Sequence, residues 1–162
     1  MLENIYMFNC HLIVLGKYKE EYWQAAEAEY SKRLKPYAKL IITEINEERF
    51  SNIEDRETIQ KKEAEKILKA MPDGAFVIAC DENGKELASV EFANLLVNQS
   101  GQGQKICFIL GGPLGLHKSI IQIANLRLSL SQMTFPHQLA RVILLEQIYR
   151  AATIANQKQY HY

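Results

Sequence analysis

The stretch Phe108-Ile109-Leu110-Gly111-Gly112-Pro113-Leu114-Gly115 decides the fold that this sequence predicts. It joins an apolar run, typical of a buried parallel strand, to a loop rich in glycine. In open α/β sheets, ligands bind beyond the carboxyl ends of the strands, where glycine lets a ligand lie against the backbone. A tight turn into a helix explains the same residues equally well. On this stretch alone, both interpretations stay open.

Strand patterns alternate with helix patterns on both sides of this stretch. Strands are predicted at residues 11–15, 39–45, 75–80, 105–110 and 126–130. Helices are predicted at 20–34, 53–71, 89–97, 118–124 and 138–155, with loops at 81–85 and 129–138. The alternation predicts one α/β domain over residues 1–162, with three layers and a mainly parallel sheet of five to six strands.

The glycine loop lacks the signatures of phosphate-binding loops. It is not G-x-G-x-x-G, and no acidic residue stands about 20 positions further on to hold a ribose. Gly84-Lys85 does not belong to a P-loop, because Glu86 follows it and Ala79 stands where the first glycine would be. A ligand without phosphate needs neither device, and S-adenosyl-L-methionine is such a ligand.

A second loop, residues 129–138, follows the next predicted strand and leads into the last helix. Two loops on neighbouring strands are what a cofactor pocket requires. Backbone groups of this loop can bind an adenine edge, and Leu130, Met133 and Phe135 can cover it. Packing in the core explains Met133 and Phe135 as well.

The net charge of zero conceals a gradient along the chain. Residues 1–100 carry 13 basic and 18 acidic side chains, whereas residues 101–162 carry 6 basic ones and a single acidic one, Glu146. A neutral total argues against a general nucleic-acid binder. The gradient indicates either a basic working surface in the C-terminal part or simply an acidic helix in the first half.

Cysteine and histidine usage predicts a reducing compartment and no metal site. Cys10, Cys80 and Cys107 are widely spaced, and the four histidines have no metal-ligand spacing. No stretch approaches the length of a membrane span, and the N-terminus does not read as a signal peptide. We therefore expect a cytoplasmic protein without membrane contact.

The last predicted helix is apolar on more than one face. Val142, Ile143, Leu144 and Leu145 are consecutive, so the apolar positions do not form a single stripe. A small domain has little with which to cover both faces. This pattern predicts a homodimer.

Several motifs occur together in a recognisable order. They are Gly111-Gly112-x-x-Gly115-Leu116-His117, then Met133-Thr134-Phe135-Pro136-His137-Gln138, then Glu146-Gln147-Ile148-Tyr149-Arg150-Ala151, then Tyr160-His161. With them the chain resembles the ribosomal RNA large subunit methyltransferase H family over nearly its whole length. These are small enzymes of the SPOUT superfamily that methylate N3 of a pseudouridine in 23S ribosomal RNA.

The resemblance implies a SPOUT (Rossmann-like) fold with a deep C-terminal trefoil knot formed by residues 111–117 and 126–136. It also implies a homodimer that acts on 23S rRNA in the assembled ribosome. S-adenosyl-L-methionine is expected to bind in the knot. The residues expected to contact it are Cys80, Gly111, Leu130, Ser131, Gln132, Met133, Thr134 and Phe135.

The same resemblance directs attention to the C-terminal tail for catalysis. His161 is the first candidate for general base or proton relay, Tyr160 would orient it, and His137 is the alternative. Arg141 and Arg150 would bind RNA, although Arg150 could instead pair with Glu146 one turn earlier.

Two departures from the family pattern accompany these expectations. Residues 1–7 precede the usual start and form an N-terminal extension or follow an upstream start codon. Tyr162 stands where the family usually has Arg or Lys. Arg127, Arg141 or Lys158, or stacking by Tyr162, would then take over the contact with the RNA.

Overall fold

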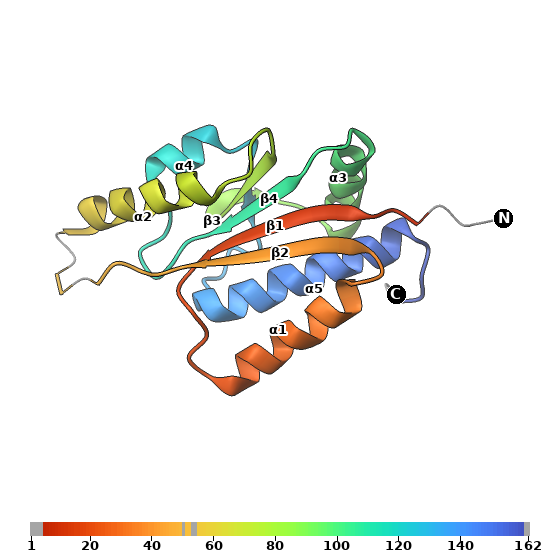
Figure 1. Ribbon diagram of the computed structural model, residues 1–162, viewed down its shortest axis with the longest axis horizontal. Helices are drawn as coiled ribbons and strands as arrows, with labels where there is room; N and C mark the ends of the chain where they lie inside the picture. Colours follow the sequence, from red (N-terminus) through yellow and green to blue (C-terminus); the bar gives the residue numbers. More distant parts are fainter. Residues whose placement is uncertain (1–4, 50, 53–54, 161–162) are drawn as a thin grey trace.

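A computed structural model describes residues 5–49, 51–52 and 55–160. In this part of the chain, five strands form one sheet whose neighbours are all parallel. In sheet order they are β2 (Ala38–Ile45), β1 (Phe8–Leu15), β4 (Ile106–Leu110), β3 (Phe76–Glu86) and β5 (Leu126–Ser129). The helices are α1 (Glu21–Leu34), α2 (Arg56–Ala70), α3 (Ser89–Gly101), α4 (Lys118–Ile123) and α5 (His137–Ala155). The predicted α/β class is confirmed (Figure 1).

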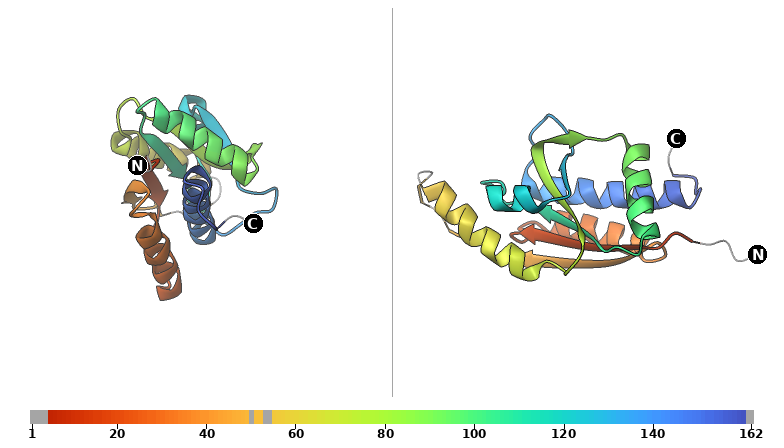
Figure 2. Two further views of the ribbon diagram at one scale, coloured as in Figure 1. Left: turned by 90° about the vertical axis from the view of Figure 1, so that its right-hand side faces the viewer. Right: turned by 90° about the horizontal axis from the view of Figure 1, so that it is seen from above.

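Both faces of the sheet are covered, which explains why the strands are apolar throughout. Side chains alternate between faces along a strand. In β1, Leu12 and Val14 therefore join the core under α1, α3 and α5, whereas Ile13 and Leu15 join the core under α2 and α4. Figure 2 shows these helices on opposite sides of the sheet. Burial of each fully buried aliphatic side chain stabilises the fold by about 1.5–3 kcal/mol. The helices on both sides of the sheet confirm the predicted three layers.

The long helix α5 packs between α1 and α3 against the sheet (Figure 1). Leu144, Leu145 and Ile148 are fully buried there. Val142 and Ile143 remain only half-buried, so part of the second apolar face lacks cover in a single copy. The homodimer stays a prediction.

The prediction of a loop at residues 81–85 is wrong, because these residues belong to strand β3, which continues to Glu86. Cys80 is in register with Leu128 of β5, and Lys85 returns to the same partner after an irregular segment. The backbones cross closely here, since a Cβ on Gly84 would lie 2.7 Å from the carbonyl of Arg127. A pattern of neighbouring residues cannot reveal this pairing, because the partner strand is more than 40 residues away. The trefoil knot stays a prediction.

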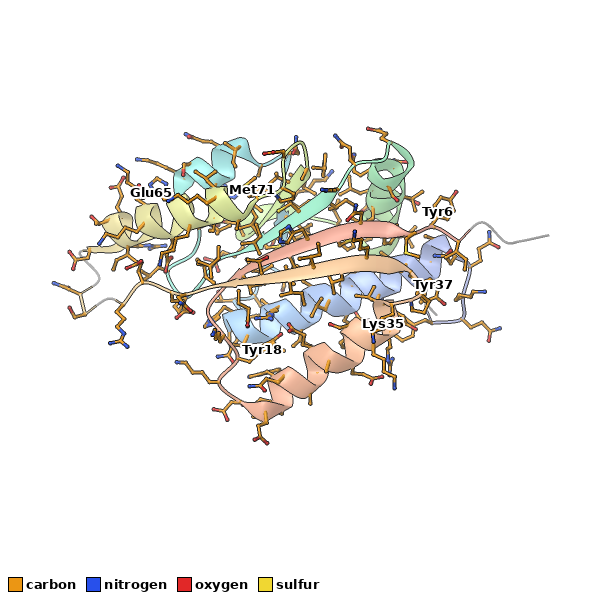
Figure 3. The ribbon with its side chains drawn as sticks, viewed as in Figure 1. Tyr6, Tyr18, Lys35, Tyr37, Glu65 and Met71 are labelled. Carbon is orange, nitrogen blue, oxygen red and sulfur yellow. The ribbon has the colours of Figure 1, made fainter. Side chains whose placement is uncertain are left out.

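The residues before β1 contact the other end of the chain. The backbone N–H of Tyr6 donates to the side-chain oxygen of Asn156 at 2.8 Å, and the Asn156 amide donates to the Tyr6 carbonyl at 3.3 Å. Figure 3 labels Tyr6 at the N-terminal end of β1. Residues 1–4 of the predicted extension lie outside the described residues.

Candidate functional site

The two predicted ligand loops meet at the carboxyl edge of the sheet. The strand register puts Cys80 beside Leu110 on one side and beside Leu128 on the other. Residues 111–117 and 130–136 leave from this edge and enclose a cavity of about 670 Å³. That volume lies within the range of sites for small organic ligands.

The wall of this cavity combines apolar cover with a few polar groups. Leu110, Leu116, Leu128, Leu130 and Phe135 supply the apolar part, and Asp81, Glu82, Asn83, Ser131 and Thr134 the polar part. Such a mixture suits a small organic ligand that has both apolar and polar parts.

Seven of the eight predicted cofactor residues line this cavity. They are Cys80, Gly111, Leu130, Ser131, Met133, Thr134 and Phe135. Gln132 belongs to the same loop but is not among the lining residues, and its side chain is exposed. Met133 is 75% exposed, so core packing does not explain it.

Close backbone approach explains why the first loop needs glycine. A Cβ on Gly111 would lie 2.9 Å from the backbone of Gly115, which itself has a φ of +77°. The Gly115 N–H donates to the Gly112 carbonyl at 3.0 Å and closes a tight turn. A side chain at position 111 would therefore displace the loop.

Helix α2 fixes the outer part of the glycine loop. Gln60 Nε2 and Arg56 Nη2 donate to the Leu114 carbonyl at 2.6 and 2.9 Å. Arg56 also lines the cavity. The sequence reasoning missed both residues, because they lie more than 50 positions before the loop and belong to no motif.

The second loop is held by short-range hydrogen bonds. Ser129 Oγ donates to the Ser131 carbonyl at 2.9 Å, and the Met133 N–H donates to Ser131 Oγ at 3.0 Å. Thr134 Oγ1 donates to Glu82 Oε2 at 3.0 Å and so ties the loop to the extended part of β3. These bonds pre-organise the loop, which lowers the ordering cost when a ligand binds.

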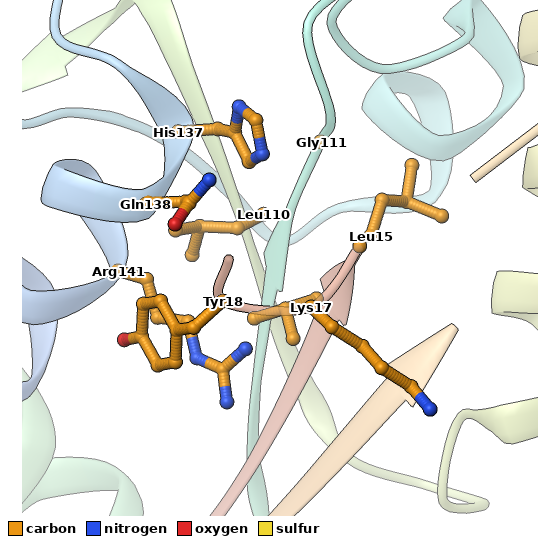
Figure 4. Close-up of a pocket in the computed structure, with 10 residues that line it drawn as sticks. Leu15, Lys17, Tyr18, Leu110, Gly111, His137, Gln138 and Arg141 are labelled. Carbon is orange, nitrogen blue, oxygen red and sulfur yellow. The ribbon is translucent and has the colours of Figure 1, made fainter. Parts of the chain in front are cut away.

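Arg141 lies beneath the cavity in a buried cluster of charges. Its guanidinium contacts Glu27 and Glu44 and stacks over the Tyr18 ring at 4.1 Å, and its side chain is 5% exposed. Figure 4 shows Tyr18 and Arg141 together below His137. Burial is the largest influence on the pKa of Arg141 and lowers it, but hydrogen bonds to the two carboxylates outweigh it, so the pKa is raised. The group is charged at all working pH values.

His137 stands at the cavity wall, at the first position of α5. Its Nε2 lies 3.3 Å from Glu47 Oε1, and both side chains are about one-quarter to one-third exposed (26% and 32%). The sequence reasoning missed Glu47, which follows β2 in a segment without a motif.

The described end of the tail packs against the far part of α5. Tyr160 donates to Glu146 Oε1 at 3.2 Å and contacts the Tyr149 ring edge-on at 4.7 Å between centroids. Arg150 pairs with Glu146 at 2.6 Å and lies over the Tyr160 ring. Burial, followed by a hydrogen bond with Tyr30, raises the pKa of Tyr160 to about 12, so the phenol keeps its proton at neutral pH. His161 and Tyr162 lie outside the described residues.

The two remaining predicted RNA contacts differ in setting. Arg127 on β5 pairs with Asp81 at 2.8 Å, and Asp81 lies in the part of β3 that lines the cavity. The Nε atom of Arg127 is buried and has no hydrogen-bond partner. Lys158 is exposed in the tail, and its backbone N–H donates to the Thr153 carbonyl.

The described part of the chain has neither a metal-binding cluster nor a helix that could span a membrane. Residues 5–49, 51–52 and 55–160 contain no group of three or more His, Cys, Asp or Glu side chains that could hold a metal ion. None of the described helices has the length and apolarity needed to cross a membrane.

Comparison with known proteins connects this geometry to a family. Residues 8–161 match the family model described as "Predicted SPOUT methyltransferase". A protein of Clostridium botulinum (strain 657 / Type Ba4) named "Ribosomal RNA large subunit methyltransferase H" is 46% identical over 157 residues, which cover 94% of this chain and 99% of the relative. Proteins of the same name from Clostridium tetani and Carboxydothermus hydrogenoformans are each 45% identical, over 94% and 93% of this chain and 99% and 97% of their own lengths. The chain therefore belongs to the SPOUT methyltransferase family.

Proposed function

We propose that this protein is a methyltransferase that uses S-adenosyl-L-methionine to methylate N3 of a pseudouridine in 23S rRNA of the assembled ribosome. The observation that carries the proposal is the full-length similarity to proteins named ribosomal RNA large subunit methyltransferase H. The cavity between residues 111–117 and 130–136 supports it, because its size and mixed wall suit this cofactor. With the ribosome as its substrate, the protein would act in the cytoplasm.

The cofactor would be held mainly by the two loops at the sheet edge. Gly111 lets the first loop fold closely onto Gly115, and Leu130, Ser131, Met133, Thr134 and Phe135 would surround the adenosine, with Gln132 at the outer side of the loop. When bound, S-adenosyl-L-methionine supplies an electrophilic methyl group on a sulfonium. The main task of the chain is then to place N3 of the base in line with that methyl group.

A homodimer would complete the site, since the tail of one copy packs away from its own cavity. Tyr160 contacts Tyr149, which lies twelve residues along α5 from His137, or about 18 Å along the helix axis. The half-buried Val142 and Ile143 offer apolar surface for a second copy. In such a dimer, the tail of one subunit would serve the cavity of the other.

Proton removal is the second task of the chain. The imide proton on N3 must leave, and a histidine is suited to accept it near neutral pH. His161 of the tail is the first candidate, with Tyr160 as the residue that orients it, and His137 at the cavity wall is the alternative. Arg127, Arg150 and Lys158 would contact RNA. Arg141 would act indirectly, because its guanidinium is buried on Glu27 and Glu44.

The charge distribution fits a substrate recognised by shape. The neutral chain has its basic excess after residue 101, in the part that carries both cavity loops, α5 and the tail. A neutral total weakens non-specific binding to free RNA, because such binding depends on the counterions that basic side chains release. Recognition of one nucleotide in a folded particle suits this distribution.

The test is methyl transfer to ribosomes and to free rRNA from a strain that lacks the gene. With labelled S-adenosyl-L-methionine, we expect label in ribosomes and mass spectrometry to place it on N3 of a pseudouridine. Label on another nucleotide would point to a different RNA substrate. Cofactor binding without any label would point to a non-catalytic ribosome-binding protein, and either result contradicts the proposal.

A second experiment tests the tail. Deleting residues 160–162 should abolish transfer and leave the cofactor Kd within about twofold, because the residues proposed to hold the cofactor lie on the two loops at the sheet edge and are all retained. Unchanged turnover would exclude a catalytic tail.

A further inference from the structure

Glu47 reaches His137 through a passage that Gly16 leaves open, because glycine has no side chain to fill it. Glu47 lies two residues after β2, beside Gly16 at the end of β1. A Cβ on Gly16 would lie 2.2 Å from Glu47 Oε1, and one on Gly112 would lie 3.5 Å from the same atom. A side chain at position 16 would therefore occupy the place of this carboxylate. The passage connects the edge strand β2 with the start of α5.

Helix α2 holds the segment that carries Glu47. The buried carboxylate of Glu63 accepts the Glu48 N–H at 3.0 Å, and Lys66 Nζ donates to the Asn46 carbonyl at 3.2 Å. Lys66 also pairs with the Glu48 carboxylate at 2.6 Å. On the other side, the Gly16 N–H donates to the Ile45 carbonyl and continues the β1–β2 ladder. The backbone on either side of Glu47 is thus anchored, which limits the positions its side chain can take.

The partner of Glu47 faces both cavities at the sheet edge. His137 lines the large cavity and also a small one of about 10 Å³ below it, together with Leu110, Gly111 and Gln138. Figure 4 shows the His137 imidazole beside the backbone of Gly111, the residue at which the first cofactor loop begins. An imidazole at this place is next to any ligand that lies against the glycine loop.

We propose that Glu47 is a positioning residue for methyl transfer, which holds the His137 imidazole in one orientation and one tautomer at the cavity wall. This inference rests on the proposed function. His137 Nε2 lies 3.3 Å from Glu47 Oε1, and because an ionised carboxylate only accepts hydrogen bonds, this approach favours the tautomer that carries its proton on Nε2. Nδ1 is then the acceptor that the neutral ring offers. The same logic orients histidine bases in hydrolases, where a carboxylate sets the tautomer.

The proton balance of this arrangement is simple. The N3–H bond of the target base breaks, the proton moves to Nδ1 of His137, and the electron pair stays on N3 as the nucleophile. The resulting imidazolium faces the negative charge of Glu47 at 3.3 Å, which stabilises it. In this arrangement His137 acts as the general base, and Glu47 keeps its imidazole in the orientation and tautomer that can accept the proton.

Glu47→Gln tests this inference, with Glu65→Gln as the matched control. Both substitutions remove one negative charge, but Glu65 is exposed on α2 and is not among the residues that line the cavity. We expect Glu47→Gln to lower kcat at least about tenfold, since a positioned base contributes 10²–10⁴-fold. The cofactor Kd should stay within about twofold, and Glu65→Gln should behave like the unchanged protein.

The tautomer of His137 is the readout that a merely structural role would not move. In 15N-histidine-labelled protein without cofactor, long-range 1H–15N spectra should show the Nε2–H form of His137, identified by its loss in His137→Ala. Glu47→Gln should convert this signal to a mixture or to the Nδ1–H form. Retention of the Nε2–H form in Glu47→Gln, or a kcat within twofold of the unchanged protein, would overturn the inference.

A double substitution separates this role from folding. If Glu47 acts through His137, then Glu47→Gln added to His137→Ala should cause no further loss of kcat. An additional tenfold loss would assign Glu47 another role. If the unchanged protein transfers no methyl group to ribosomes, the proposed function fails, and the tautomer spectrum alone decides whether Glu47 positions His137.

Discussion

Arg141 and Glu27 join the start of α5 to the middle of α1 by two parallel hydrogen bonds, one of which spans 2.8 Å from Nη2 to Oε1. Glu44 of β2 accepts a third bond from the same guanidinium at 2.9 Å. This arrangement is bidentate and largely buried, which is the geometry in which an ion pair matters for the fold. The first turn of α5, with His137 and Gln138 at the cavity wall, therefore depends on charges on β2 and α1.

Replacing Arg141 with Met should destabilise the protein by about 3 kcal/mol, because it leaves two carboxylates in a poorly solvated place. Urea unfolding measures this loss. Arg33→Ala is the control, because the Arg33–Glu29 pair is solvent-exposed and should contribute little. Unchanged stability with lost RNA binding would instead assign Arg141 to the RNA.

Gln60→Ala should weaken cofactor binding about fivefold, because one net hydrogen bond is worth about 1 kcal/mol. The lost bond is the 2.6 Å contact between Gln60 Nε2 and the Leu114 carbonyl, which restrains the glycine loop. Titration calorimetry with S-adenosyl-L-methionine gives the Kd. Lys61→Ala, at the exposed neighbouring position, should not change it. Equal Kd values for both variants would show that the hydrogen bond from Gln60 to the Leu114 carbonyl does not affect cofactor binding by the glycine loop.

Gly84→Ala should cost about 1–3 kcal/mol, the usual range for overpacking, because its Cβ would meet the backbone of Arg127 and Leu128 at 2.7 Å. Thermal denaturation reports the loss. Gly101→Ala is the matched control: a Cβ there meets nothing within 4 Å, and the residue ends α3. A Gly84→Ala variant as stable as Gly101→Ala would contradict the close crossing of β3 and β5.

Stability should fall as the pH rises above about 8.5. Burial raises the pKa of the Cys10 and Cys107 thiols to about 12, whereas unfolded cysteines ionise near 8.5. Between these values the unfolded chain has lost protons that the folded chain keeps, so the free energy of unfolding declines by up to about 1.4 kcal/mol per pH unit for each thiol.

Urea titrations at pH 7, 9 and 10 measure this dependence. The comparison is with a Cys10→Ala/Cys107→Ala double variant. Other groups also titrate in this pH range, but they are the same in both proteins, so the difference in stability loss reports the two thiols. The variant should lose less stability between pH 7 and pH 10 than the unchanged protein. Parallel losses in the two proteins would show that the thiols are not responsible.

Much of the architecture follows from local patterns in the sequence. The apolar run at 106–110 and the glycines after it predicted β4 and its ligand loop, and both are found there. Helix and strand periods located nine of the ten elements to within a few residues, because each element buries a face whose spacing is local, whereas β3 runs six residues beyond its predicted end. The start of the second helix, predicted at Ile53, is at Arg56, and Ile53 lies outside the described residues.

The candidate site was predictable only where its residues belong to a motif. Cys80, Gly111 and the loop from Leu130 to Phe135 lie at ends of strands that the sequence shows, and seven of these eight predicted residues line the cavity. Glu47, Arg56 and Gln60 carry no such signal. They reach the site because parallel strands bring their carboxyl ends to one edge, so residues more than 50 positions apart become neighbours.

The sequence by itself determined the order of strands and helices, the two buried faces of the sheet and the loops that form the cavity, because these depend on side-chain periodicity and glycine content. Only the tertiary structure decided which charges meet. It buried Arg141 on Glu27 and Glu44, placed Tyr160 on Tyr149 rather than at the cavity, and brought Glu47 to His137. The physical reason is that a charged side chain takes its partner from whichever element packs beside it, and that partner is set by the strand order and not by distance along the chain.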